Sequence, residues 1–74
     1  MTEDGKKYGI KVYFDENMSM KYVTSWWDSK EMRDEALKLF MDRMNKGDTI
    51  VKLGKFAIVC RYVVVSECME KWEE

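Results

Sequence analysis

Apolar and polar residues alternate near the start of the chain, in the pattern of a half-buried β-strand. The apolar positions of this segment fall on one face: Tyr8, Ile10, Val12 and Phe14. The other face carries Lys7, Gly9, Lys11 and Tyr13. Turn-forming residues follow at 15–17, and a second alternating segment then runs to Trp27. The pattern predicts a β-hairpin, with Phe14 opposite Met18.

The central segment has the periodicity of an amphipathic helix. Its apolar residues recur at steps of three, four and five: Met32, Ala36, Leu37, Phe40, Met41 and Met44. Gly47 then supplies the residue type that most often ends a helix in the left-handed conformation. We therefore expect a helix over residues 29–46.

The residues before this helix predict how it begins. Asp28 is a favoured N-cap residue, and Glu31 stands three positions later, where it completes a capping box. In that register Trp27 and Met32 occupy the two positions of a hydrophobic staple. The sequence predicts Asp28 as the N-cap.

A second hairpin is predicted around Gly54-Lys55, because a leading glycine suits a two-residue type II′ turn. If Leu53 faces Phe56, both sides of this hairpin are apolar. The run FAIVCRYVVV at 56–65 is apolar except for Arg61. Such a run indicates a central strand, a bend between faces, or a surface covered by a partner.

The end of that run predicts a change of direction. A guanidinium buried in mid-strand without a partner is costly, so we expect a bend or bulge at Arg61-Tyr62 before 63–65 continue the sheet. The remaining residues, 66–74, are expected to form a helical turn with Met69 and Trp72 on one side, or to fray.

The expected element order is strand, strand, helix, strand, strand in a single domain spanning 1–74. This order is typical of an α+β fold with a small antiparallel sheet, one helix across one face, and a short C-terminal turn or helix. The helix covers one side of the sheet. The other side must then be solvated or meet a partner, and function is expected there.

Composition narrows the function classes. The 74 residues carry a formal net charge of −1, which argues against a general nucleic-acid binder. The two cysteines, Cys60 and Cys68, are expected to be reduced thiols in a cytoplasm. The longest apolar run is about half of what a membrane-spanning helix needs, so a membrane span is not expected.

Catalytic and metal-binding chemistry is not indicated. The chain has no histidine, the commonest general base and metal ligand. Two cysteines are too few for a structural zinc site, and the four glycines form no phosphate loop. We expect no enzyme activity, no metal and no cofactor.

Two surfaces are candidates for binding. In the predicted hairpin register Lys11 lies opposite Lys21, on a face shared with Lys7 and Tyr13, and such a strip can bind nucleic acid or simply solubilise a sheet face. Trp26 and Trp27 must point to opposite faces of a strand, so one of them is exposed or lies in an interface. The candidate residues for a protein interface are Trp26, Arg61, Tyr62 and Val64.

The strand, strand, helix, strand, strand order and the stretch TIVKLGKFAIVCRYVVVSE resemble small accessory proteins of bacteriophages and other mobile elements, including anti-CRISPR inhibitors of host defence. The resemblance covers most of the chain and has no diagnostic motif. It implies a non-enzymatic protein that occupies a host protein. From the apolar second hairpin we also expect self-association, as a homodimer or other oligomer, or docking on a larger partner. The alternative is a nucleic-acid-binding regulatory module that uses the lysine strip.

Overall fold

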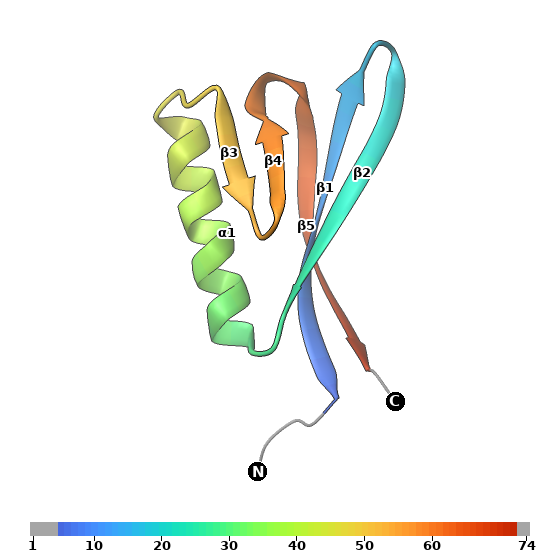
Figure 1. Ribbon diagram of the computed structural model, residues 1–74, viewed down its shortest axis with the longest axis vertical. Coiled ribbons are helices and arrows are strands. Elements are labelled where there is room, and N and C mark those ends of the chain that lie inside the picture. The colour runs from blue at the N-terminus through green and yellow to red at the C-terminus, as the bar shows by residue number, and fades with distance from the viewer. Residues whose placement is uncertain (1–4, 73–74) are drawn as a thin grey trace.

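The computed structural model describes residues 5–72 and has the expected α+β architecture (Figure 1). Within residues 5–72 the fold consists of one helix and five strands, and all strand pairs are antiparallel. The elements are β1 (Lys6–Glu16), β2 (Ser19–Trp27), α1 (Lys30–Asn45), β3 (Ile50–Leu53), β4 (Phe56–Val59), a 3-10 turn (Cys60–Tyr62) and β5 (Val63–Trp72). The strands form two sheets, one with three strands in the order β2-β1-β5 and one with β3 and β4. The expectation of one sheet was therefore wrong.

The predicted alternation of β1 is confirmed. Tyr8, Ile10 and Val12 are buried, with Ile10 and Val12 fully inaccessible. As the central strand, β1 pairs with β2 on one side and β5 on the other. One face of this sheet contributes to the core.

The register of the first hairpin differs from the prediction. Phe14 pairs with Lys21 rather than with Met18, and Lys11 pairs with Thr24 rather than with Lys21. The reason is the turn, in which Asn17 and Met18 have φ values of 54° and 62°. Two successive residues with positive φ are the signature of a type I′ turn, which matches the twist of the flanking strands. The strands therefore continue two residues beyond Phe14 before the chain reverses.

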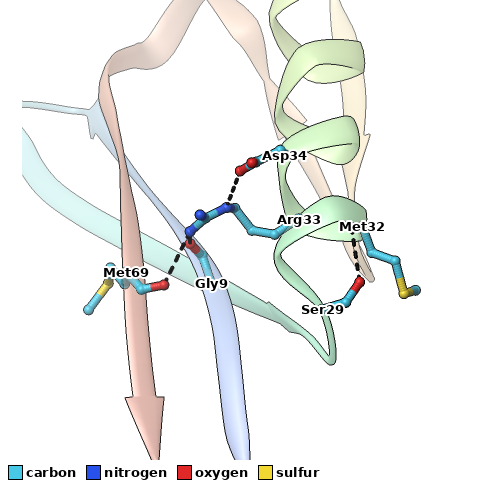
Figure 2. Close-up of polar contacts among 6 residues, drawn as sticks. All are labelled: Gly9, Ser29, Met32, Arg33, Asp34 and Met69. Carbon is cyan, nitrogen blue, oxygen red and sulfur yellow. Dashed lines mark hydrogen bonds and ion pairs between the residues drawn. The ribbon is translucent and has the colours of Figure 1, made fainter. Parts of the chain in front are cut away.

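The helix lies where the periodicity placed it, but its N-cap is Ser29 rather than Asp28. The Ser29 hydroxyl accepts a hydrogen bond from the Met32 amide at 3.2 Å (Figure 2). With the cap one residue later, Trp27 and Met32 no longer hold the staple positions. Trp27 packs instead against the core, and Met32 is 54% exposed. Serine and aspartate are equally good caps, so propensity could not choose between adjacent residues.

The predicted end of the helix at Gly47 is confirmed. Gly47 has a φ of 90°. Its amide donates to the Met44 carbonyl at 3.0 Å, and the Asp48 amide donates to the Arg43 carbonyl at 3.2 Å. This pair of bonds is a Schellman motif, which satisfies carbonyls that the helix end leaves without partners.

The second hairpin has the predicted register, with Leu53 opposite Phe56 and Val51 opposite Ile58. Gly54 alone in the turn has a positive φ, 62°, as the leading position of a type II′ turn requires. The hairpin is held to β2 by a buried hydrogen bond from the Ser25 hydroxyl to the Leu53 carbonyl at 3.1 Å. The turn itself lies against Ser25.

The apolar run at 56–65 is divided between two sheets. The 3-10 turn at Cys60–Tyr62 ends β4 and redirects the chain, as expected for Arg61-Tyr62. A β-bulge follows, because Phe14 pairs with Val63 and Tyr13 with Val65, which leaves Val64 unpaired. The bend therefore lets β5 leave the hairpin and pair with β1.

The expected helical turn or frayed end after residue 65 was wrong for the described residues. Strand β5 continues to Trp72, and its register with β1 places Met69 opposite Gly9 and Trp72 opposite Lys6. Pairing along the length of β1 overrides the weak local helical pattern. Residues 73–74 lie outside the described part of the chain.

The core lies between the three-stranded sheet, the helix and the second hairpin. Its buried members come from all three: Ile10, Val12, Phe40, Val51, Leu53 and Ile58. Figure 1 shows α1 beside β3, with the N-terminal end of the helix next to the C-terminal end of β2. No helix within residues 5–72 is long and apolar enough to cross a membrane.

Candidate functional site

The face of the three-stranded sheet opposite the core has no other element over it in the described part of the chain. We call it the open face. It consists of Lys7, Gly9, Lys11 and Tyr13 of β1, Met20, Tyr22, Thr24 and Trp26 of β2, and Val65, Glu67, Met69 and Lys71 of β5. The pairing arranges most of these residues in cross-strand rungs. Each rung consists of three residues that lie directly opposite one another on β2, β1 and β5.

The first rung is apolar and consists of Tyr22, Tyr13 and Val65. Tyr22 is 59% exposed and Val65 is 51% exposed. The two tyrosine rings lie with centroids 6.0 Å apart and tilted by 52°, within the range of a favourable aromatic pair. Met20, next along β2, is also 59% exposed and extends the apolar surface.

The second rung is charged and consists of Thr24, Lys11 and Glu67. The Lys11 ammonium lies 4.1 Å from the Tyr22 ring centroid and 5.0 Å from that of Tyr13. The Tyr13 hydroxyl donates to Glu67 at 3.2 Å. Hydrogen bonding to Tyr13 raises the pKa of Lys11, against the opposing effect of desolvation, and Glu67 adds to the rise. Lys11 is therefore cationic at neutral pH and held over two rings.

The third rung is apolar again and consists of Trp26, Gly9 and Met69. A β-carbon at Gly9 would lie 2.6 Å from the indole of Trp26, so glycine is what lets the ring lie against the sheet. The Lys71 ammonium lies 4.4 Å from the centroid of that indole. Trp26 and Trp27 thus point to opposite faces, as predicted, and Trp26 is the one on the open face.

Arg33 supports this rung from the other side of the sheet, and sequence reasoning missed it. Its side chain is 4% exposed. Figure 2 shows it reaching from α1 to the strands, where Nη1 donates to the carbonyls of Gly9 and Met69, each at 3.3 Å. Nε donates to Asp34 at 2.7 Å. The available signal was its position, seven residues before Phe40 on the buried stripe of the helix.

The predicted protein-interface residues do not share one surface. Trp26 lies on the open face, whereas Arg61 and Tyr62 lie in the 3-10 turn and Val64 in the bulge. Arg61 donates to the Tyr62 hydroxyl at 2.9 Å and lies over its ring. Tyr62 also borders a cleft of about 120 Å³ whose lining includes Phe14 and Ile58.

The predicted lysine strip is only partly assembled. Lys7, Lys11 and Tyr13 share the open face, but Lys21 does not, because it pairs with Phe14 on the opposite face. Lys21 lies 3.8 Å from Glu16, and Lys7 forms an ion pair with Asp28. The prediction that Lys21 belongs to the strip was wrong because it depended on the hairpin register.

Both cysteines are free thiols in different surroundings. Burial, with a smaller contribution from Asp48, raises the pKa of Cys60. Cys68 is exposed on β5. Among residues 5–72, no three histidine, cysteine or acidic side chains gather closely enough to hold a metal ion.

Cys68 is expected to react with a soluble disulfide reagent at pH 8 about tenfold faster than Cys60, because the thiolate is the reactive species and Cys60 is both shielded and harder to ionise. The rate at Cys60 should keep rising to higher pH than that of an ordinary thiol, since its pKa is raised. Stopped-flow labelling measures both phases. The Cys68→Ser variant should lose the fast phase, and loss of the slow phase instead would contradict the assignment.

Comparison of the chain with protein-family models, curated proteins and solved structures found no significant match. The geometry of the open face is therefore the basis for inferring a function.

Proposed function

We propose that this chain is a non-enzymatic protein-binding module that contacts its partner through the open face. The observation that carries the proposal is the pair of apolar rungs, centred on Tyr13 and Gly9, that flank a charged rung on a sheet face that no element within residues 5–72 covers. The first rung and Met20 form a contiguous exposed apolar surface, and such a surface on a small domain marks an interaction site. The chain has no histidine to serve as a general base.

The residue types favour a protein partner. Tyrosine, tryptophan and methionine are enriched at protein interfaces, and tyrosine and tryptophan are over-represented among the residues that dominate binding energy. Tyr22 and Trp26 supply two rings on one strand, and Met20 and Met69 supply side chains that adapt to the shape of a partner. The open face therefore combines rigid aromatic and adaptable apolar contacts.

The charges of the open face favour protein over nucleic acid. A nucleic-acid site needs a clear excess of cations directed at phosphates. Here Lys11 lies over two tyrosine rings and beside Glu67, Lys71 lies over Trp26, and Lys7 is paired with Asp28. The lysines thus engage local rings and carboxylates. On the resemblance to phage accessory proteins, we take the partner to be a host protein.

Replacing Tyr22 with glutamate is expected to weaken partner binding at least about tenfold, because it places a charge at the centre of an apolar contact. Leu39→Glu is the matched control, since Leu39 lies on the helix and is exposed to the same extent, 59%. Both variants and the parent protein are tagged and used to capture partners from host-cell lysate, with and without nuclease treatment. The captured protein is then purified and titrated against all three.

The expected result is a stoichiometric protein partner that binds the parent and Leu39→Glu alike and loses affinity for Tyr22→Glu. Recovery that depends on intact nucleic acid would overturn the proposal and favour the lysine-based alternative. A partner that loses affinity only for Leu39→Glu would place the site on the helix and contradict the assignment to the open face.

A further inference from the structure

Strand β5 is an edge strand with an open side. It pairs only with β1, and no strand within residues 5–72 lies at its other edge. Seven of its ten residues are exposed. Figure 1 shows its C-terminal half extending beyond the β3–β4 hairpin. An edge of this length presents unpaired N–H and C=O groups to which a further strand can add.

The contacts of Arg33 indicate which backbone groups of β5 point away from β1. One atom, Nη1, lies 3.3 Å from both the Gly9 and the Met69 carbonyl oxygens, so both oxygens are directed into the space between β1 and β5. Backbone groups alternate in direction along an antiparallel strand. Cys68 and Glu70 therefore direct their N–H and C=O groups to the open edge.

We propose that β5 pairs antiparallel with β5 of a second copy of this chain, with the two-fold axis at Met69. In this register Glu67 lies opposite Lys71 of the second copy, and the same pair recurs on the other side of the axis. Cys68 lies opposite Glu70, so the outward backbone groups of the two strands meet. Opposite charges directly across a strand pair are stabilising.

The charged residues of β5 favour this register over the registers in which the two-fold axis is shifted along the strand. A two-fold axis at Glu67, Glu70 or Lys71 would place that charged residue against its own copy. An axis at Cys68 would place Glu67 against Met69. Neither Glu67 nor Lys71 would then lie opposite a residue of the other charge. Among these five positions, only the axis at Met69 matches carboxylate with ammonium.

The surroundings of β5 support the same arrangement. Within one chain, Lys71 lies opposite Lys7 on β1, a juxtaposition of like charges that is unfavourable. The second copy would place Glu67 on the other side of Lys71. At the axis the apolar rung of Trp26, Gly9 and Met69 would meet its own copy. Trp72, which is 66% exposed, would lie opposite Ser66.

The dimer goes beyond the proposed function and does not depend on it, because its backbone pairing uses the free edge of β5, although the side chains of Glu67, Met69 and Lys71 that set its register also belong to the open face. It would join the open faces of two copies into one continuous surface. If no partner binds the open face, the dimer proposal still stands. If the protein is monomeric, a partner can still bind the open face of a single copy.

Sedimentation equilibrium of the full chain tests the dimer, with the parent compared to Glu67→Lys, Lys71→Glu and the double swap. Each single swap puts like charges opposite each other twice per dimer, so the dissociation constant should rise about tenfold. The double swap exchanges the charges and should return the constant to within about threefold of the parent. Glu35→Lys, an equal charge change at an exposed helix position, should have no effect.

Restoration by the double swap identifies the contact, because residues 67 and 71 of one strand lie about 13 Å apart and cannot pair within the chain. A parent protein that stays monomeric at millimolar concentration would overturn the proposal. So would a dimer whose dissociation constant is unchanged by either single swap.

Cross-linking tests the register without relying on charge. Met69→Cys places two thiols at the axis, where strand geometry brings α-carbons within the distance a disulfide spans, so mild oxidation should give a covalent dimer. Glu67→Cys is the matched control on the same face, because its copies would lie too far apart to bridge. Both variants carry Cys68→Ser. Equal cross-linking of the two would contradict the register.

Discussion

Replacing Arg33 with alanine is expected to lower the free energy of unfolding by about 2–4 kcal/mol. The substitution removes two hydrogen bonds from a charged donor to the carbonyls of Gly9 and Met69 and leaves a cavity under β1. In the parent protein, the cost of burying the guanidinium offsets part of the stability that these hydrogen bonds and this packing provide. Urea denaturation followed by circular dichroism measures the change.

Arg43→Ala on the same helix is the matched control. Arg43 is exposed and lies 3.8 Å from Asp48, so its loss should change stability by no more than about 0.5 kcal/mol. Arg33→Met keeps much of the volume without the charge and should cost less than alanine. Equal stabilities of the alanine variants at 33 and 43 would show that the contacts of Arg33 hold little of the fold together.

Replacing Gly54 with alanine is expected to cost about 2–4 kcal/mol, for two reasons that add. The backbone at Gly54 has a φ of 62°, which an L side chain adopts at a cost of about 1–2 kcal/mol. A β-carbon there would also lie 2.5 Å from the Ser25 hydroxyl oxygen, which binds the Leu53 carbonyl. The second hairpin would have to move away from β2, as in an overpacked core. Thermal and urea unfolding measure the loss.

Gly47→Ala separates the two reasons. Gly47 also has a positive φ, 90°, but a β-carbon there would meet nothing within 4 Å. Its substitution should cost only about 1 kcal/mol. Ser25→Gly should rescue part of the Gly54→Ala loss by removing the clash. Equal costs at 47 and 54, without rescue, would mean that the close contact between the hairpin and β2 is unimportant.

Local signals were sufficient for part of the fold. The helix could be predicted because its apolar stripe and Gly47 agree, and the second hairpin because Gly54 fixes the turn and hence the register. The bend at Arg61-Tyr62 followed from the cost of burying a lone cation. In each case a few neighbouring residues determine the conformation.

The first hairpin shows where local signals are insufficient. The turn at Asn17-Met18 places a methionine at positive φ, a position for which its residue type gives no indication. The polar run Asp15-Glu16-Asn17, which ends at the first turn residue, looks like a better turn. A shift in the turn changes each pairing, which is why Lys21 was assigned to the wrong face.

Two further features depend on contacts distant in sequence. Strand β5 forms because β1 is long enough to pair with it, and residues 66–72 alone do not show this. Arg33 is buried because the carbonyls of Gly9 and Met69 lie within its reach. The rungs of the open face require all three strands to be placed, so of its main residues only Trp26, Lys7, Lys11 and Tyr13 could be proposed from the sequence.

The most direct test of binding through the open face is photo-cross-linking inside host cells. A photoreactive phenylalanine analogue is placed at position 22 in one variant and at position 39 in another. The proposal predicts a nuclease-resistant adduct with one other protein from position 22 and none from position 39. An adduct from position 39 alone, or one with nucleic acid from position 22, would contradict it.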